Sequence, residues 1–236
     1  MNKRHFLGQH FLISESIAKA IVDHADITKK DEVLEIGTGK GILVPYLCKL
    51  ANQVTSIETD RELYAQALEK FSNLKNLSLK HGDGFKLDSD FTIFVSNLPY
   101  SESRNAIEWL AQKKFSHAVI MVQKEFAEKL LAKPGDKNYR AITILANHCF
   151  KIEPLMDVKK ANFSPSPKVD SVVLRLDCKH KIPKNLVSTV NKLFSYRRKT
   201  IHNVAKQFGV SIDSNQRLED LTYGEIIKLA KQIIKI

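Results

Sequence analysis

The chain has little of what a membrane-embedded, secreted or metal-binding protein needs. No stretch reaches the roughly 18 consecutive apolar residues of a membrane-spanning helix. The first residues hold neither an apolar run nor a small-residue cleavage site, so no secretory signal is expected. The three cysteines, Cys48, Cys149 and Cys178, form no CxxC pair, and no HExxH pair is present. We therefore expect free thiols in a reducing, cytoplasmic compartment, and neither a membrane nor a metal as a partner.

Glycine and proline are also scarce, with 9 and 7 residues, which excludes a collagen-like or low-complexity chain. The 236 residues are 43% hydrophobic and 27% charged. This composition can bury the core of one large domain, or of one typical domain with a small appendage.

Acidic residues are outnumbered, at 26 against 37 Lys and Arg, and the net charge is +11. The surplus is uneven, because the last 58 residues carry twelve basic and four acidic side chains. A basic surplus favours a polyanionic partner, since neutralising phosphates releases condensed counterions. A solubilising surface is the alternative that charge alone leaves open.

Short buried strands alternate with amphipathic helices along the first half of the chain. Alternation at this pace implies right-handed crossovers and a mostly parallel sheet. Two later apolar stretches, 148–154 and 171–176, are expected to add antiparallel strands at one edge. The sequence therefore predicts a doubly wound α/β fold. We predict helices at 14–25, 42–51, 61–71 and 105–112, and strands at 31–37, 53–58, 77–81, 91–96 and 117–123.

The character of the sequence changes after Asp177. Residues 179–183, Lys-His-Lys-Ile-Pro, are typical of a charged hinge. Beyond it apolar residues follow helical spacing, and Thr222 with Glu225 forms a capping-box pattern before the last helix. We predict two domains: residues 1–178 form the α/β domain, and residues 179–236 form a small, basic, all-helical domain whose charge suits a polyanion such as RNA.

The strongest local signal is the segment 35–41, Glu-Ile-Gly-Thr-Gly-Lys-Gly, directly after a predicted strand. Gly37 and Gly39 allow a tight turn and leave room for a ligand against bare N–H groups. The spacing matches neither the GxGxxG fingerprint nor the P-loop, so a compact nucleoside is favoured over a pyrophosphate. Glu58 ends the next strand, where a carboxylate can accept hydrogen bonds from ribose hydroxyls. An ordinary strand-end carboxylate is the alternative.

Polar groups also follow the third and fourth strands. Asp83 is placed to accept the exocyclic amine of a purine, although Asp-Gly alone marks a turn. The fourth strand leads into Asn-Leu-Pro-Tyr at 97–100. Pro99 biases Leu98 to an extended conformation, which directs the Asn97 amide oxygen and the Leu98 carbonyl outward beside the Tyr100 ring. Two acceptors and a flat ring suit an aromatic amine taken from its stack.

Together these motifs resemble those of the S-adenosylmethionine-dependent ribosomal RNA adenine N6,N6-dimethyltransferases. The chain is most similar to the small-subunit dimethyladenosine transferases, with the macrolide-resistance methylases of large-subunit RNA as cousins. The match covers nearly the whole chain in the family's motif order, and His10 stands where many members have Asn. The matching segments are Leu-Gly-Gln-His-Phe-Leu at 7–12, the turn at 33–41, Glu58, Gly-Asp at 82–83, the tetrapeptide at 97–100, and the Phe-x-Pro-x-Pro-x-Val motif at 163–171.

The resemblance implies a Rossmann-like class I methyltransferase domain with S-adenosylmethionine as the cofactor. Tyr100 would stack on the target adenine, with Phe163 on its other face. Arg197, Arg198 and Lys199 would hold RNA phosphates. The cofactor contacts implied are Gln9, His10, Leu12, Gly37, Gly39, Glu58, Asp83 and Asn97, and the catalytic tetrapeptide is Asn97, Leu98, Pro99 and Tyr100.

The implied function is dimethylation of adenines in small-subunit ribosomal RNA during ribosome biogenesis, by a monomer acting on an immature small subunit. One alternative is a large-subunit methylase of the macrolide-resistance type. Another is a ribosome-assembly RNA-binding factor in which methylation is secondary. A DNA or small-molecule methyltransferase is disfavoured by Leu98 and by the basic C-terminal region.

Overall fold

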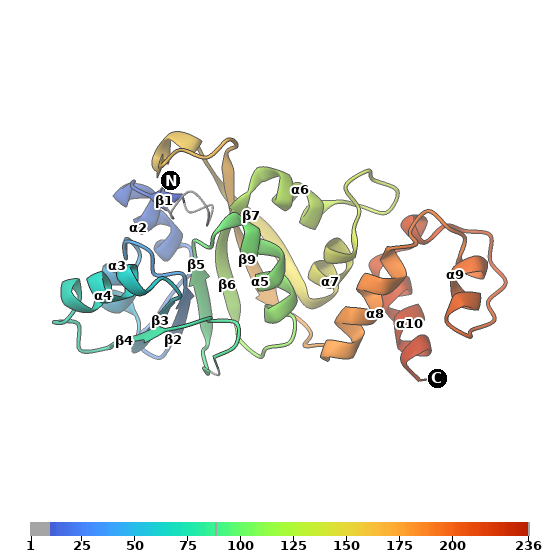
Figure 1. Ribbon diagram of the computed structural model, residues 1–236, viewed down its shortest axis with the longest axis horizontal. Helices are drawn as coiled ribbons and strands as arrows, with labels where there is room; N and C mark the ends of the chain where they lie inside the picture. The colour runs from blue at the N-terminus through green and yellow to red at the C-terminus, as the bar shows by residue number, and fades with distance from the viewer. Residues whose placement is uncertain (1–9, 88, 236) are drawn as a thin grey trace. The chain divides into compact units, whose positions relative to one another are not determined.

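The computed structural model describes residues 10–87 and 89–235, which divide into two compact units (Figure 1). The sheet unit takes the chain up to Ser103, with Lys114–Lys124 and Glu153–Cys178. The helical unit consists of Arg104–Lys113, Glu125–Ile152 and the chain from Lys179 onward. None of the helices in the described part of the chain has both the length and the apolar content of a membrane span.

The sheet unit is built on a mostly parallel sheet, as predicted. The described residues form a seven-stranded sheet in the order β4-β3-β2-β5-β6-β9-β7. The pairs β2/β3, β2/β5, β3/β4 and β5/β6 are parallel, whereas β9 runs antiparallel to β6. This is the doubly wound class expected from the alternating pattern. The strands are β2 (Glu32–Ile36), β3 (Gln53–Glu58), β4 (Leu77–His81), β5 (Ile93–Ser96), β6 (His117–Gln123), β7 (Phe150–Val158) and β9 (Ser171–Cys178).

Three helices of the sheet unit begin and end close to their predicted positions: α2 (Glu15–Asp23), α3 (Val44–Leu50) and α4 (Arg61–Lys70). Side-chain caps define two of their starts. The Ser14 hydroxyl accepts the N–H of Ile17, and the Asp60 carboxylate accepts two N–H groups in the first turn of α4. Apolar side chains from these helices and from the central strands form one buried core cluster.

A second, two-stranded sheet joins segments that lie far apart in the sequence. Strand β1 (Phe11–Leu12) runs antiparallel to β8 (Phe163–Ser164), and Leu12 lies opposite Phe163. The N–H of Ile13 extends the pairing by donating to the Asn162 carbonyl at 2.9 Å. The sequence marked both segments as motifs but did not predict that they form strands. Their pairing ties the start of the described chain to the late Phe-x-Pro-x-Pro motif.

The helical unit confirms the all-helical prediction for the C-terminal region. Helix α10 packs against both α7 and α8 through buried residues that include Ile226, Ile227 and Ala230. The predicted capping box is present: Glu225 accepts the Thr222 N–H, and Thr222 accepts the Glu225 N–H. The helices are α5 (Ser103–Leu110, which starts at the last residue of the sheet unit), α6 (Lys124–Leu131), α7 (Ala141–Cys149), α8 (Lys184–Phe194), α9 (Ile201–Gln207) and α10 (Tyr223–Ile234).

Two helices, α6 and α7, were not predicted. In α7 the run Ala-Ile-Thr-Ile-Leu-Ala is buried without interruption, so it lacks the periodicity that identifies an amphipathic helix. His148 was assigned to the strand that follows, but it lies in the last turn of α7. The compact helical unit consequently begins well before residue 179. The division of function between residues 1–178 and 179–236 stays a prediction.

Gly41 tests how tightly the glycine turn after β2 packs against Phe71, which directly follows α4. Its φ is +71°, and an added Cβ would lie 2.2 Å from Cε2 of Phe71, a ring that is 6% exposed and fixed in the core. Replacing Gly41 by Ala should lower the free energy of unfolding by about 2–4 kcal/mol, from backbone strain plus overpacking. Gly135→Ala is the matched control, because Gly135 also has a positive φ (+84°) but has no atom within 4 Å of the added Cβ. It should cost about 1 kcal/mol. Equal shifts of the urea midpoint would contradict the packing argument.

Candidate active site

The carboxyl ends of β2, β3, β4 and β5 meet at one edge of the sheet (Figure 1). The Gly37 N–H donates to the Ile57 carbonyl at 2.7 Å, and the Gly82 N–H donates to the Glu58 carbonyl at 2.9 Å. At the end of β5 the Ser96 hydroxyl donates to the last carbonyl of β2 at 2.6 Å. These bonds hold the four strand ends together, at the edge where open α/β sheets bind their ligands.

The glycine turn after β2 offers bare backbone to this edge. Gly37, Gly39 and Gly41 have φ values of +87°, +57° and +71°. A Cβ on Gly39 would lie in van der Waals contact with Phe11 at 3.4 Å, and a Cβ on Gly37 with Pro99 at 3.9 Å, so the turn lies next to β1 and the tetrapeptide. The positive φ values favour glycine, and the turn therefore presents backbone without side chains, as a compact ligand lying on it requires.

The Glu58 carboxylate holds this turn from β3. Its Oε2 accepts the Gly39 N–H at 2.7 Å, and its Oε1 accepts the Asp60 N–H at 2.8 Å. The side chain is buried, and bonds of this charge-assisted kind are stronger than neutral ones. Each carboxylate oxygen keeps a second lone pair, so Glu58 can still accept a pair of hydroxyls from a ribose.

A buried polar chain lies beneath the turn. The Ser56 hydroxyl donates to Oε2 of Glu35 at 2.5 Å, and Thr38 Oγ1 lies 2.6 Å from the Ser56 oxygen. Since the Ser56 proton is directed to Glu35, Thr38 is the donor in the second bond. Burial raises the pKa of Glu35 to about 8; the Ser56 hydrogen bond opposes this rise and the charge of Glu58 adds to it. Glu35 therefore carries its proton at neutral pH.

Asp83 lies beyond the end of β4 and is exposed. Its Oδ1 accepts the Phe85 N–H at 3.1 Å, and its Oδ2 pairs with the Lys86 ammonium at 3.2 Å. The bond from Gly82 to the Glu58 carbonyl brings Asp83 to the same edge as Glu58. An exposed carboxylate there can exchange the Lys86 contact for a ligand amine, because surface ion pairs of this kind are weak.

Asn97 and Leu98 follow β5 directly. Among the described residues nothing forms a hydrogen bond with the Asn97 side-chain amide, which is half-buried. Leu98 is buried, at 5% exposure, and fixes the strand end in the core. The Asn97 amide therefore has unused hydrogen-bonding capacity, two residues before Pro99, which lies beside Gly37.

Tyr100 lies at the centre of a small aromatic cluster. Its hydroxyl is 2.7 Å from the Oγ of the fully buried Ser171. The ring centroid of His10 is 5.6 Å away at an interplanar angle of 30°, and Nδ1 of His10 bonds to the Pro165 carbonyl at 2.8 Å. Burial raises the pKa of the Tyr100 hydroxyl, so the phenol is neutral at physiological pH. Segments that lie far apart in the sequence, around His10 and Ser171, thus contact one aromatic ring at the carboxyl edge of the sheet.

Phe163 does not present an open face to Tyr100. Its ring is 3% exposed, and its plane makes an angle of 65° with that of Tyr100 at 6.5 Å. The reason is that Phe163 lies opposite Leu12 in the β1/β8 pair and belongs with it to the core cluster. Stacking of Phe163 on a substrate base stays a prediction. Gln9, the remaining predicted cofactor contact, lies outside the described residues.

The predicted RNA-contacting residues lie in the helical unit and differ in exposure and in ion pairing. Arg197 pairs with Glu219 at 3.5 Å, and its side chain is 25% exposed. Arg198 and Lys199 are exposed. Lys199 lines a groove of about 500 Å³ with Asn203, Lys206 and Gln207. Arg198 and Lys199 are therefore the members of the predicted trio that can reach a phosphate without breaking an ion pair.

Sequence reasoning assigned no role to Ser171, Ser56 or Thr38. Ser171 ends the late motif, so its place in that motif was the available signal. Ser56 lies opposite Glu35 in the β2/β3 register. This pairing depends on two separate strands, so no local sequence pattern could predict it.

The buried proton of Glu35 predicts a pH dependence of stability. An ordinary Glu has its pKa near 4.5 and the buried one near 8, so the unfolded chain binds fewer protons between these values. The free energy of unfolding should fall as pH rises from about 4.5 to about 8, by up to about 1.4 kcal/mol per unit. Glu35→Gln should remove this slope, and Glu69→Gln, on the exposed surface of α4, should keep it. Urea titrations at pH 5.5 and 7.5 measure the difference; an unchanged slope in Glu35→Gln would refute the assignment.

Comparison with known proteins identifies the family of the chain. A family model described as ribosomal RNA adenine dimethylase matches residues 1–235. The ribosomal RNA small subunit methyltransferase A of Thermotoga maritima is 36% identical over 96% of this chain and 84% of its own length. The protein of the same name from Clostridium botulinum is 35% identical over 98% of this chain and 94% of its own length.

Solved structures of RNA methyltransferases share the fold of this chain. A dimethyladenosine transferase from Plasmodium falciparum is 28% identical with a TM-score of 0.82, covering 96% of this chain and 98% of its own. The 23S rRNA methyltransferase ErmE, at 22% identity and a TM-score of 0.67, covers 95% of this chain and 99% of its own and shares the fold. The Rossmann-like class I methyltransferase fold expected from the sequence is thereby confirmed. The chain belongs to the ribosomal RNA adenine dimethylases, a family of S-adenosylmethionine-dependent methyltransferases.

Proposed function

We propose that this chain dimethylates N6 of adenines in small-subunit ribosomal RNA, within an immature small subunit in the cytoplasm and as a monomer. One observation supports the proposal: the half-buried Asn97 amide, which has no hydrogen-bond partner among the described residues, belongs to the same tetrapeptide as Pro99, which lies beside Gly37, and Tyr100, whose hydroxyl is bonded to Ser171. A donor site and a base-stacking site are thus adjacent at one sheet edge.

The residues of the edge fit S-adenosylmethionine. The bare turn at Gly37 and Gly39 would support the nucleoside, Glu58 the ribose hydroxyls, and Asp83 the adenine amine of the cofactor. His10, Leu12 and Asn97 would close the site around the remainder. When bound, the cofactor supplies an electrophilic methyl group on a sulfonium.

The chain's own part in the reaction is to orient the target amine. The N6 lone pair of adenine is delocalised into the ring, which makes the amine a poor nucleophile. The Asn97 Oδ1 and the Leu98 carbonyl would accept the two N6 hydrogens and draw the nitrogen toward tetrahedral geometry. Fixed acceptors also stabilise the positive charge that develops on N6. No metal takes part in this proposal.

Tyr100 would provide the stacking surface for the everted adenine. His10 lies along one side of the ring, so the base would use another part of its surface. The bond to Ser171 keeps the ring in place before RNA arrives, and this reduces the entropy lost on binding. Arg198 and Lys199 would hold phosphates and so position the RNA without reading its sequence.

The relatives favour the small subunit over the large subunit. The Thermotoga and Clostridium proteins are named for the small subunit at 35–36% identity, whereas the ErmE likeness supports the fold alone. A purely structural role in ribosome assembly is less consistent with an Asn97 amide that has no partner in the described chain and with Glu58 and Asp83 at the same sheet edge.

Methylation of immature small and large subunits with labelled donor, followed by mapping of the modified adenines, tests the function. The wild-type chain should label small-subunit RNA, and Asn97→Ala should lower the rate by roughly 10²–10³, the scale of one lost oriented polar group. An unchanged urea midpoint of the variant should show that the fold is intact. Labelling of large-subunit RNA alone, or an Asn97→Ala rate near wild type, would defeat the proposal.

The stacking role of Tyr100 predicts different outcomes for two substitutions. Tyr100→Ala removes the ring and should weaken RNA-dependent turnover by about 10–100-fold, since stacking contributes about 1–3 kcal/mol per base. Tyr100→Phe keeps the ring but loses the Ser171 bond, and it should stay within about fivefold of wild type. Single-turnover rates and KM for RNA give the comparison. If Phe were as damaging as Ala, the hydroxyl rather than the ring would be the functional group.

A further inference from the structure

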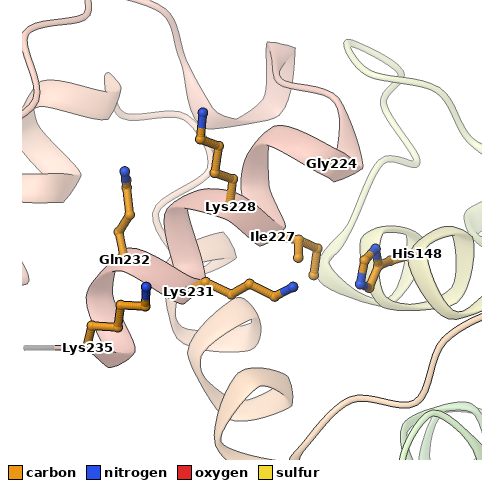
Figure 2. Close-up of a pocket in the computed structure, with 7 residues that line it drawn as sticks. All are labelled: His148, Gly224, Ile227, Lys228, Lys231, Gln232 and Lys235. Atoms are coloured by element: carbon orange, nitrogen blue, oxygen red, sulfur yellow. The ribbon is translucent and has the colours of Figure 1, made fainter.

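The helical unit contains a basic groove that the proposed function does not use. It lies between α7 and α10 and has a volume of about 480 Å³ (Figure 2). Figure 2 shows Lys231 reaching from α10 toward His148 of α7, with Ile227 beside the imidazole. The groove shares no residue with the one at Lys199. Its lining consists of His148, Gly224, Ile227, Lys228, Lys231, Gln232 and Lys235.

The lysines of the groove lie on one stripe of α10. Lys228, Lys231 and Lys235 are spaced by three and four residues, so they share a helix face, and all three are exposed. Within the described part of the chain none of them forms an ion pair with a carboxylate. The Glu225 carboxylate of the same helix instead accepts the N–H and the hydroxyl of Thr222 at the helix start. The positive charge of the stripe is therefore not neutralised by its own helix.

A further lysine approaches the groove from the segment before α8. The N–H groups of Lys179 and His180 donate to the Cys149 carbonyl at the end of α7, at 2.8 and 3.2 Å. The His180 ring lies beside His148, with centroids 5.2 Å apart and the planes tilted by 32°. Burial lowers the pKa of His148, and the charges near it, those of Lys231 and Lys179 included, lower it further. The positive charge at the groove therefore comes from its lysines, because His148 is neutral.

An arrangement of like charges lowers the stability of the folded chain unless an anion binds there. The stripe from Lys228 to Lys235 extends about 10 Å along α10, which matches about three phosphates of one strand at about 3.4 Å each. A protein partner fits poorly, because lysine is depleted in the cores of protein interfaces and Ile227 is the one large apolar residue that lines the groove in the described chain.

We propose that the α7–α10 groove is a phosphate-binding site for the ribosomal RNA substrate, in addition to the surface at Arg198 and Lys199. The inference rests on the proposed function and extends it, since the groove would engage a part of the RNA backbone that the first basic surface does not hold. Its contacts position the RNA and carry no sequence preference.

The test compares two triple variants of the full chain with equal loss of charge. One is Lys228→Gln, Lys231→Gln, Lys235→Gln. The control is Lys30→Gln, Lys49→Gln, Lys75→Gln, three exposed lysines of the sheet unit. Binding to immature small subunits is measured across a salt series. For the groove variant the slope of log affinity against log salt should fall by about 2–3, with an affinity loss of about 10–100-fold at low salt. The control should lose less than about threefold.

Two further measurements separate the possible failures. Donor affinity should be unchanged in both variants, and the urea midpoint should not fall in either, because the substituted side chains are exposed. If the wild type methylates small-subunit RNA but the groove variant keeps its salt slope, the groove is not an RNA site, whatever else binds there. If the wild type neither binds nor methylates the particles, the proposed function fails, and this inference fails with it.

Discussion

The hydrogen bonds of the Glu58 carboxylate are the interaction on which the site depends. One side chain at the end of β3 accepts the N–H of Gly39 in the turn after β2 and the N–H of Asp60 at the start of α4. A parallel sheet brings these segments to the same edge, and the carboxylate fixes their spacing. The glycine turn can remain free of side chains because a charged, buried acceptor holds its backbone.

The protonated Glu35 side chain supports the same turn through the Ser56 hydroxyl. Glu35 lies opposite Ser56 in the β2/β3 register, and the Ser56 hydroxyl connects it to Thr38 of the turn. Burial removes Glu35 from water and raises its pKa to about 8, and the nearby Glu58 adds to this rise, so Glu35 keeps its proton while Glu58 accepts amide hydrogens. Acids on two neighbouring strands therefore support the same turn in different ways.

In the proposed function, RNA binding and chemistry fall to different units of the chain. The sheet unit holds the carboxyl edge of the strands and the Tyr100 ring, which contacts Ser171 and His10. The helical unit exposes Arg198 and Lys199. Such charges would position a phosphate backbone without selecting a base, so selection would fall to the Tyr100 ring and the Asn97 amide.

Local sequence patterns determined the strands from β2 to β6, the helices α2, α3 and α4, and the order of the motifs, because periodicity, caps and glycine turns act over a few residues. They could not identify α7, whose continuous burial hides its period, or Ser171, whose partner Tyr100 lies 71 positions away. Only the tertiary structure decided that Phe163 enters the core and that Arg197 is paired with Glu219, because both depend on contacts between segments that are remote in the chain. Residue types fix what chemistry is possible, whereas packing decides which of those residues remain available for it.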